Sequence, residues 1–443
     1  MVFKKHISQS IFRHRIPRLI FLILLLINIS GCSKDSSNLS EREKMLEDAN
    51  LLFETIETNH IMFAQNLEPL EYYILKEEFL NDINENMNRE EFFIRSNAVL
   101  ASLNDGHTYI IDPKKKELNI QWRYIDGKLI VLEKTTLPQG SEIISIGGTD
   151  ISEIIEFTKT LHPIENQIAI ELNIENYAKK YSALSVFGVE INLRGSTSTT
   201  LIEYKHNEEV FARYVRFFGG YEAYMLTNAS AARNIPRNRS YIKDDVFIFQ
   251  LGAFWFDHGF NNSINSLAKY IENGGDSVII DLRDSPGGNI QVGLDILDEL
   301  NATHGMYSLA TYIPKTPLET DELSEKSVRE IIFNNSQHIV GNIDVNLIVL
   351  TNRYSFSSAV MLPALIQDAN IGIVVGEIPA NSPNAYIDSI MFKLPYSEYE
   401  VFYSHKYWAR PNEKAPANKL IPDYIINFNE DALEIALQII KDK

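Results

Sequence analysis

Residues 277–289 read SVIIDLRDSPGGN, and this stretch decides the fold of the C-terminal half of the chain. Residues 277–282 are almost continuously apolar, as expected of a strand in a sheet that is buried on both faces. Residues 346–350 (NLIVL) have the same character, and helical patterns occupy residues 260–272 and 358–367. Strands that alternate with helices predict an α/β architecture with parallel strands.

The loops that follow these two strands carry the candidate chemistry. The first contains Pro-Gly-Gly at 286–288, and the second reads TNRYSFSSA at 351–359. Ligands of open α/β sheets bind beyond the carboxyl ends of the strands. A glycine turn leaves backbone N–H groups uncovered, and these groups can stabilise an oxyanion. Each pattern alone is typical of a turn or a helix cap, but together on successive strand ends they favour an active site.

Three regions can be delimited along the chain. Residues 41–115 are predicted to form an N-terminal helical domain, because apolar residues recur there near a 3.6-residue spacing. Residues 116–240 are expected to form a PDZ-like and mixed region. Within it, residues 120–132 alternate around an Asp-Gly turn signal, and residues 137–150 (LPQGSEIISIGGTD) resemble a stretch of PDZ domains. Residues 241–443 form the predicted α/β core.

The N-terminal segment resembles the signal of bacterial lipoproteins. Five basic residues precede an apolar run at 19–29, and Ser-Gly stands before Cys32. These parts are typical of a secretory signal, and the run is shorter than the roughly 20 residues that span a bilayer, which disfavours the alternative of a transmembrane anchor. We expect residues 1–31 to be a signal peptide and residues 32–40 a tether lipidated at Cys32. The protein would then be anchored outside the cytoplasm, to the cell membrane or the outer membrane.

The composition disfavours several classes of function. The net charge is −18, and it becomes −23 when the five basic residues of the signal are removed. Such an acidic chain disfavours nucleic acid and anionic lipid headgroups as partners. Cys32 is the only cysteine, which excludes disulfides, thiolate metal sites and a cysteine nucleophile. The sequence has no His-Glu-x-x-His motif and no phosphate-binding glycine loop, and we expect neither a metal nor a cofactor.

Five motifs in order resemble those of the C-terminal-processing peptidase family of serine peptidases, which includes the tricorn core protease. The motifs are LNDGHT at 103–108, IIDLRDSPGGN at 279–289, YSFSSA at 354–359, IVVGE at 373–377 and LIPD at 420–423. The resemblance covers residues from about 45 to 443. It implies a ClpP/crotonase-like α/β catalytic core with a PDZ-like β domain and an N-terminal helical domain.

The resemblance also implies roles for particular residues. Ser357 matches the nucleophile, and the following Gly-Glu strand selects it over Ser355 and Ser358. His107 matches the general base. A serine hydroxyl needs such a base to become a good nucleophile, and the pKa of histidine suits that role near neutral pH. The implied oxyanion donors are the backbone N–H groups of Gly287 or Gly288 and of Ser358. The histidines without such a motif are expected to be structural, and they include His60, His258 and His405.

One departure from the family pattern decides between two mechanisms. The processing branch uses a Ser–Lys dyad, but Ser382 stands at the position of that lysine, and Lys393 has no motif support. The tricorn-like branch uses a histidine that a glutamate orients. Glu413 lies 56 residues after Ser357, in the corresponding interval. Two other carboxylates stay open as alternatives, and they are Asp423 and Glu377.

A second departure concerns the residue before the histidine. Tricorn-like sites have a serine there, whereas this chain has Gly106. The missing member of the site is therefore absent or supplied from elsewhere, and Thr108 is one candidate.

These patterns together predict a membrane-anchored extracytoplasmic serine endopeptidase. It would cleave peptides or unfolded protein tails through an acyl-enzyme on Ser357, with His107 as the base. The PDZ-like region would present C-terminal peptide segments by strand addition. The alternative is a catalytically inactive peptide-binding lipoprotein of the same fold, which the two departures motivate. An esterase acting through the same site would differ only in its substrate.

Overall fold

The structure is a computed structural model. It describes residues 39–65, 67, 69–111, 116–134, 136–219, 238–305, 308–311, 332–333 and 340–443. The predicted signal peptide and Cys32 lie outside the described residues. Within the described ranges, no helix combines the length and the apolar character that crossing a bilayer requires.

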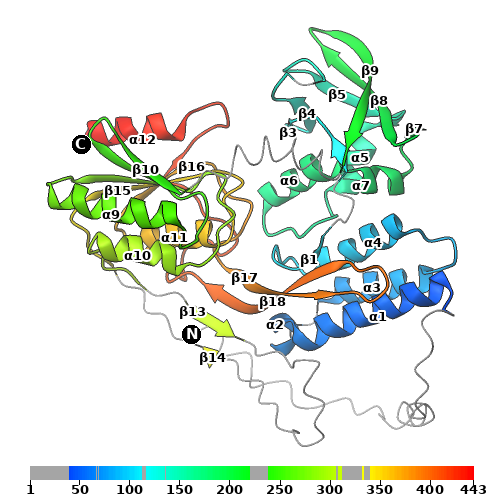
Figure 1. The fold of residues 1–443 in the computed structure, drawn as a ribbon, viewed down its shortest axis with the longest axis horizontal. Coiled ribbons are helices and arrows are strands. Elements are labelled where there is room, and N and C mark those ends of the chain that lie inside the picture. Colours follow the sequence, from blue (N-terminus) through cyan, green and yellow to red (C-terminus); the bar gives the residue numbers. More distant parts are fainter. Residues whose placement is uncertain are drawn as a thin grey trace, which may run out of the picture.

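A six-stranded sheet forms the centre of the C-terminal half (Figure 1). Its strands, in spatial order, are β10 (Arg239–Lys243), β11 (Val246–Gln250), β12 (Ser277–Asp281), β15 (Asn346–Thr351), β16 (Ile373–Gly376) and β19 (Tyr424–Ile425). Pairing is parallel from β11 to β19, and β10 joins as an antiparallel hairpin strand. The α/β architecture with parallel strands is therefore confirmed.

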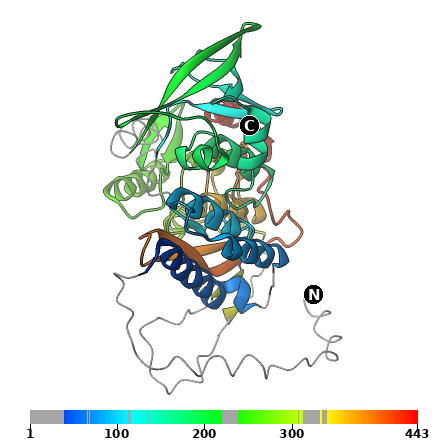
Figure 2. The same ribbon diagram turned by 90° about the vertical axis from the view of Figure 1, so that its right-hand side faces the viewer.

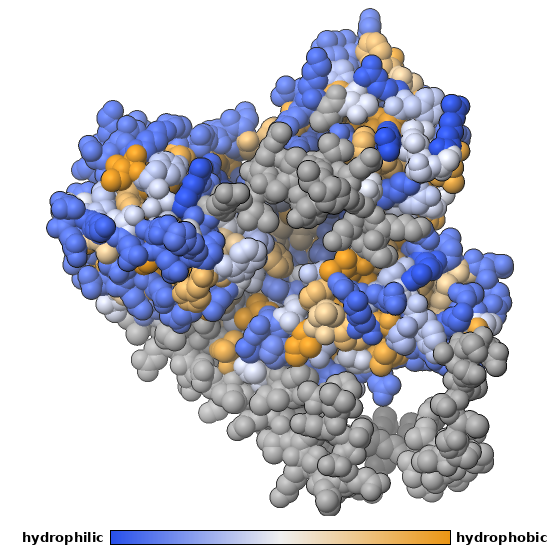
Figure 3. All heavy atoms as spheres, in the orientation of Figure 1, coloured by the Kyte–Doolittle hydropathy of each residue, from blue (hydrophilic) through white to orange (hydrophobic). Residues whose placement is uncertain are grey.

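Helices cover both faces of this sheet, which explains why its strands are apolar throughout. On one face lie α9 (His258–Glu272), α10 (Gln291–Glu299) and α11 (Ser358–Asp368), which share a core with alternate residues of the strands. On the other face α12 (Ala432–Lys441) packs against the residues between them. Hydrophilic side chains dominate the outer surface of this lobe (Figure 3). Burial of two apolar faces supplies the main driving force for this unit.

The N-terminal helices pack on a second sheet that the C-terminal half completes. The helices are α1 (Glu41–Asn59), α2 (Ile61–Ala64), α3 (Leu70–Asp82) and α4 (Arg89–Ala101). The sheet contains β1 (Tyr109–Ile110), β13 (Ser308–Thr311), β14 (Ile332–Phe333), β17 (Ala385–Lys393) and β18 (Glu400–Ala409). One apolar core joins these helices to β18, which also pairs with β1. Residues 41–115 and part of the predicted α/β core, the β17–β18 hairpin, therefore pack together in one unit.

The region predicted to be PDZ-like contains a third sheet, of eight strands. They are β2 (Glu117–Leu118), β3 (Trp122–Ile125), β4 (Lys128–Val131), β5 (Glu142–Ile146), β6 (Thr149–Asp150), β7 (Asn192–Arg194), β8 (Thr197–His206) and β9 (Glu209–Phe218). Helices α5 (Ile151–Thr158), α6 (Gln167–Tyr177) and α7 (Tyr181–Phe187) complete its core. Figures 1 and 2 show this region above the N-terminal helices, with the β8–β9 hairpin projecting outward.

Gly376 ends β16 in a conformation that glycine adopts most readily. Its φ is +148°, and a Cβ atom there would lie 1.9 Å from the carbonyl oxygen of Thr351 on the neighbouring strand. We expect Gly376→Ala to lower the free energy of unfolding by roughly 3 kcal/mol or more, because backbone overlap is added to the strain of a positive φ. Urea denaturation of both proteins measures the difference.

Gly274→Ala is the matched control for this substitution. Gly274 follows α9 with a φ of +86°, and a Cβ atom there would meet no described atom within 4 Å. Strain without overlap should cost only ~1–2 kcal/mol. If both variants lose the same free energy of unfolding, the close contact between β15 and β16 at Gly376 does not contribute to stability.

Candidate active site

Ser357 stands at a turn from strand to helix, between β15 and α11. It is the N-cap of α11, with a φ of 54° and a ψ of −124°. Residues with a side chain rarely adopt this conformation, and it persists only where the surroundings enforce it. Asn381 contributes to that enforcement, because its Oδ1 accepts a 2.6 Å hydrogen bond from the N–H of Ser357. The fold thereby places a partly buried serine where the helix dipole favours negative charge.

The neighbouring serines use their hydroxyl groups to hold loops together. Ser355 Oγ donates to the carbonyl oxygen of Leu282 at 2.9 Å, and Ser358 Oγ donates to that of Gly288 at 2.5 Å. No described hydrogen bond involves the hydroxyl of Ser357. Of the three serines, Ser357 is therefore the one whose hydroxyl is available for chemistry.

Gly287 lies directly against the turn that carries Ser357. Its φ is +83°, and a Cβ atom there would lie 2.5 Å from the oxygen of Phe356 and 2.8 Å from Ser357 Cβ. Such contacts exclude any larger residue unless a loop moves. The Pro-Gly-Gly turn is thus needed for close approach as well as for its backbone angles.

The predicted oxyanion donors lie in the two loops that meet at Gly287 and Ser357. Among the described residues, the N–H groups of Gly287, Gly288 and Ser358 donate to no partner. A 2.9 Å hydrogen bond from Phe254 N–H to the carbonyl oxygen of Gly287 fixes the turn. Free, oriented N–H groups next to a serine are the elements of an oxyanion hole.

His107 reaches this turn from the loop between α4 and β1. Its ring lies 4.6 Å from the ring of Phe356, the residue before Ser357, measured between centroids. The imidazole is buried, and neither ring nitrogen has a hydrogen-bond partner among the described residues. The structure therefore brings His107 next to the serine turn, although the two residues are far apart in the sequence.

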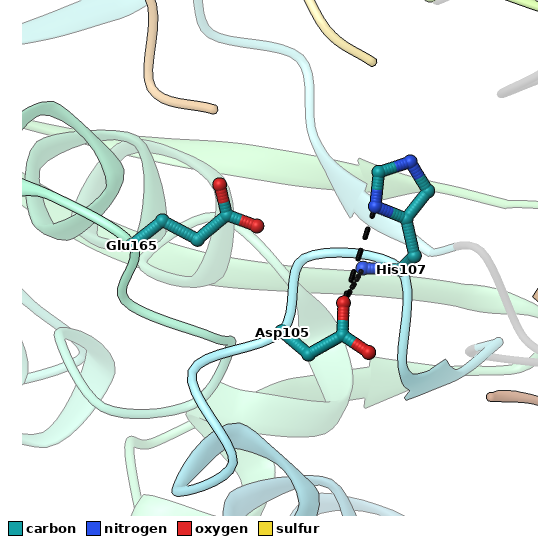
Figure 4. Close-up of side chains that lie close together, drawn as sticks. All are labelled: Asp105, His107 and Glu165. Atoms are coloured by element: carbon teal, nitrogen blue, oxygen red, sulfur yellow. Dashed lines mark hydrogen bonds and ion pairs between the residues drawn. The ribbon is translucent and has the colours of Figure 1, made fainter. Parts of the chain in front are cut away.

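Asp105 is the carboxylate that faces His107 (Figure 4). Its Oδ1 accepts a 2.9 Å hydrogen bond from the backbone N–H of His107 and lies 4.0 Å from His107 Nδ1. Its Oδ2 accepts from Thr108 Oγ1 at 2.5 Å and lies 2.9 Å from His60 Nε2. Because His60 Nδ1 accepts from the N–H of Met62, Nε2 carries the proton that His60 donates to Asp105.

The electrostatics of this pair suit general-base chemistry. Burial lowers the pKa of His107, and the charge of Asp105 is the main opposing effect. Burial acts to raise the pKa of Asp105, but the hydrogen bond from His60 is the largest of the effects that lower it to about 2. At neutral pH an uncharged imidazole therefore faces a carboxylate anion. Such an imidazole can take a proton, and the anion stabilises the imidazolium that forms.

Two further residues enter the site that no motif indicated, Glu165 and Asn381. Glu165 lies before α6, and its Oε1 accepts a 2.8 Å hydrogen bond from the N–H of Gly106. Its Oε2 accepts from Asn381 Nδ2 at 2.7 Å and from the N–H of Ser382 at 2.5 Å. Burial raises the pKa of Glu165 to about 7, although these donors act to lower it. The sequence held one signal of this contact, the small residue at position 106.

The three carboxylates that the sequence proposed to orient His107 lie in other surroundings. Glu413 is exposed in a turn after β18, and no described hydrogen bond or ion pair joins it to His107. Asp423 accepts a 2.8 Å hydrogen bond from the N–H of Val374. Glu377 forms an ion pair with Arg123. Their assignment to His107 thus has no support in the contacts, whereas Asp105 has.

The remaining candidates occupy structural positions. Ser382 Oγ donates to the carbonyl oxygen of Asn418 at 2.9 Å. Lys393 is paired with Glu400 at 3.5 Å, at the end of β17. His60 is fully buried and supports Asp105, which is a structural role beside the site.

Asp105, His107 and Glu165 are the described residues whose arrangement comes nearest to a metal site. One ligand atom from each lies within 4.8 Å of the others. Zinc bonds of about 2.0–2.2 Å would bring tetrahedral ligand atoms to roughly 3.3 Å from one another. The carboxylate oxygens already accept hydrogen bonds from Thr108, Gly106 and other donors. The group therefore fits a hydrogen-bonded acid–base cluster better than a metal centre.

Comparison with known proteins places these features in a family. Residues 249–426, which contain both the Gly287 turn and Ser357, match the family model for Peptidase family S41. Among solved structures, the chain is similar to mature CPAF, with 12% identity and a TM-score of 0.62 over 90% of this chain and 95% of that chain. It is likewise similar to a point mutant of CPAF, with 12% identity and a TM-score of 0.64 over 91% and 96% of the two chains.

At this identity, the likeness to CPAF concerns the fold. A search of curated proteins finds no significant match. The family match covers the part of the chain that carries Ser357 and the glycine turn, and the fold of the whole chain agrees with it. Residues 249–426 therefore match peptidase family S41, and this match together with the fold supports a serine-type peptidase.

Proposed function

We propose that the protein is a membrane-anchored, extracytoplasmic serine endopeptidase with Ser357 as nucleophile and His107 as general base. The observation that carries this proposal is the position of the His107 ring, 4.6 Å from the ring of Phe356, beside the Ser357 turn and the unpaired N–H groups of the glycine loop. The residues proposed as base, nucleophile and oxyanion donors are thus neighbours, which supports the proposal. The substrates are peptides or unfolded protein tails.

The reaction proceeds through an acyl-enzyme. His107 takes the proton of the Ser357 hydroxyl as its oxygen attacks the scissile carbonyl carbon. The N–H groups of the glycine turn and Ser358 stabilise the resulting oxyanion. The imidazolium then gives its proton to the leaving amine, and a water molecule, activated by the same histidine, hydrolyses the ester. Because Nδ1 is the nitrogen near Asp105, Nε2 is the nitrogen that exchanges the proton.

Asp105 acts as the acid partner of His107 in this proposal. The 4.0 Å separation between Asp105 Oδ1 and His107 Nδ1 can shorten when substrate binds, because catalytic hydrogen bonds are often long in the free enzyme. Asp105 is held by three donors and cannot swing away freely. This assignment replaces Glu413, whose side chain is exposed.

The eight-stranded sheet supports a role in substrate capture. Residues 137–150 resemble a PDZ stretch, and they form β5, the turn after it, and β6. A PDZ-like region binds C-terminal peptide segments by adding them as a strand to a sheet. Delivery of a chain terminus to Ser357 fits an enzyme that cleaves unfolded tails.

A second function rests on a specific observation. Neither ring nitrogen of His107 makes a hydrogen bond among the described residues, and the Phe356 ring lies against the imidazole. A peptide-binding lipoprotein that has lost catalysis would also show this arrangement. Activity measurements on the nucleophile and the base separate the two functions.

Fluorophosphonate labelling tests the nucleophile and the base together. We expect the wild-type protein to be labelled, and Ser357→Ala and His107→Ala to abolish the labelling, because the reagent reacts with an activated serine. Ser266→Ala, which alters an exposed serine on α9, is the matched control and should label normally. A folded wild type that neither labels nor cleaves a denatured protein would favour the binding protein.

The pH dependence of labelling tests the roles of His107 and Asp105. The rate should rise with pH as His107 loses its proton, with a midpoint below 6.5, because burial lowers the pKa of this histidine. Asp105→Asn removes the anion that raises the pKa of His107, so the midpoint should move to lower pH. The limiting rate should also fall by roughly 100-fold or more. A midpoint that moves upward in a folded variant would exclude Asp105 as the partner.

The proposed membrane anchor rests on the sequence around Cys32. Cells fed an alkyne-labelled fatty acid should incorporate the label into the wild-type protein, because the sulfur of a lipoprotein cysteine carries lipid. Cys32→Ser should abolish the labelling and release the protein from the membrane fraction. Label that persists in Cys32→Ser, or an unlabelled protein that stays in the membrane, would contradict lipidation at this residue.

A further inference from the structure

Glu165 connects two loops of the proposed site that come from distant parts of the chain. Its Oε1 accepts from the N–H of Gly106, next to His107, and its Oε2 accepts from Asn381 and Ser382. Figure 4 shows the carboxyl group pointing toward the loop that carries Asp105 and His107. One carboxylate thus binds the loop of the base and the loop that follows β16.

Asn381 extends this connection to the nucleophile. Its Nδ2 donates to Glu165 Oε2 at 2.7 Å, while its Oδ1 accepts from the N–H of Ser357 at 2.6 Å. The amide is 2% exposed, so both bonds lie out of water, where hydrogen bonds to a charged group are strong. A continuous chain of hydrogen bonds therefore runs from the backbone of Gly106 through Glu165 and Asn381 to the backbone of Ser357.

The space for Glu165 exists because residue 106 is glycine. A Cβ atom on Gly106 would lie 2.7 Å from Glu165 Oε1 and 3.2 Å from the ring of Phe356. The resemblance predicts a serine at this position, and here the carboxylate of Glu165 occupies the place where a side chain would project. The group missing before His107 is thus supplied by another segment.

The segment that carries Glu165 is itself fixed to the core. Asn166 caps α6 by accepting from the N–H groups of Ile168 and Ala169. Its Nδ2 donates to the carbonyl oxygens of Pro379 and Asn418, at 3.0 Å and 3.2 Å. A glutamate so anchored can hold other groups in place, because its own backbone has little freedom.

We propose that Glu165 is a positioning residue of the peptidase, which keeps the His107 loop and, through Asn381, the backbone of Ser357 in one alignment. This inference rests on the proposed function of Ser357 and His107. All three donors to Glu165 are N–H groups, so the ionised carboxylate satisfies them and the protonated form does not. Asp105 and His107 are the titratable groups that face it. Since burial raises the pKa of Glu165 to about 7, its ionisation changes near neutral pH.

The fluorophosphonate labelling rate of the full-length protein in detergent, measured against pH, tests this role. The wild type should show two rises with pH, one below 6.5 from His107 and one near 7 from Glu165. Glu165→Gln should remove the second rise and lower the limiting rate by roughly 10- to 100-fold, since small misplacements of reacting groups cost about that much. The matched control, Glu153→Gln, makes the same change at an exposed position on α5 and should behave as the wild type.

Asn381→Asp provides a second, independent readout. It keeps an acceptor for the N–H of Ser357 but places a carboxylate beside Glu165. Two like charges at this distance disfavour ionisation, so the second rise should move to higher pH. A variant that merely loosened the fold would not produce this shift, and the double variant Glu165→Gln/Asn381→Asp should lack the second rise if Glu165 is the titrating group.

The outcomes separate this inference from the proposed function. A wild type that does not label at all would overturn both. A wild type that labels, together with a second rise that survives in Glu165→Gln or stays in place in Asn381→Asp, would overturn only the role of Glu165. Should Glu165→Gln fail to fold, the position of the rise in Asn381→Asp decides the question.

Discussion

The parallel pairing of β12 with β15 is the interaction on which the site depends. It brings the ends of these strands together, so that the glycine turn and the serine turn meet. Side chains then lock the two loops. Asp284 N–H donates to Asn352 Oδ1 at 3.0 Å, and Asn352 Nδ2 donates back to Asp284 Oδ1 at 2.8 Å. The strained backbone of Ser357 persists because these bonds, with the Gly287 contact, leave the turn no relaxed alternative.

His107, the proposed base, reaches this framework through the second sheet. The carbonyl oxygen of His107 accepts from Ser389 Oγ on β17 at 2.9 Å, and Thr108 Oγ1 accepts from the N–H of Ser404 on β18 at 3.1 Å. The β17–β18 hairpin follows α11 in the chain and packs against the N-terminal helices (Figure 1). It therefore ties the histidine to the part of the molecule that carries the serine.

The sequence predicted the parts of the site that local patterns encode. A buried strand, a glycine turn and a serine before a helix each have short-range causes, so the parallel sheet and the two candidate loops were accessible from the chain alone, whereas the choice of Ser357 within its loop came from the family resemblance. The carboxylate that we propose as the partner of His107 was not accessible in this way. The residue spacing of the family pattern pointed to Glu413. Such a spacing predicts a position in space only when the loops between the two residues have the same length and conformation as in the family. Glu413 lies in an exposed turn, while Asp105, two residues before His107, makes the contact.

Glu165 and Asn381 were out of reach of the sequence for a related reason. Neither lies in a motif, and their contact joins segments more than 200 residues apart, with separations of 216 and 217 residues from Glu165 to Asn381 and Ser382. What sets their alignment is how α6 docks on the core. Arg353, in the nucleophile loop, is 1% exposed and pairs with Glu171 at 2.7 Å and Glu175 at 3.1 Å on that helix.

The ion pairs of Arg353 with Glu171 and Glu175 contribute more to the position of α6 than to the stability of the fold. Removing ions from water costs several kcal/mol each, which offsets much of their attraction. A shifted α6 would leave Arg353 buried without a partner, and that arrangement is far more costly than the paired one. Since Glu165 and Asn166 directly precede α6, the same docking that pairs Arg353 also delivers the Glu165 carboxylate to Gly106 and Asn381. The ion pairs of Arg353 and the hydrogen bonds of Glu165 therefore favour the same position of α6.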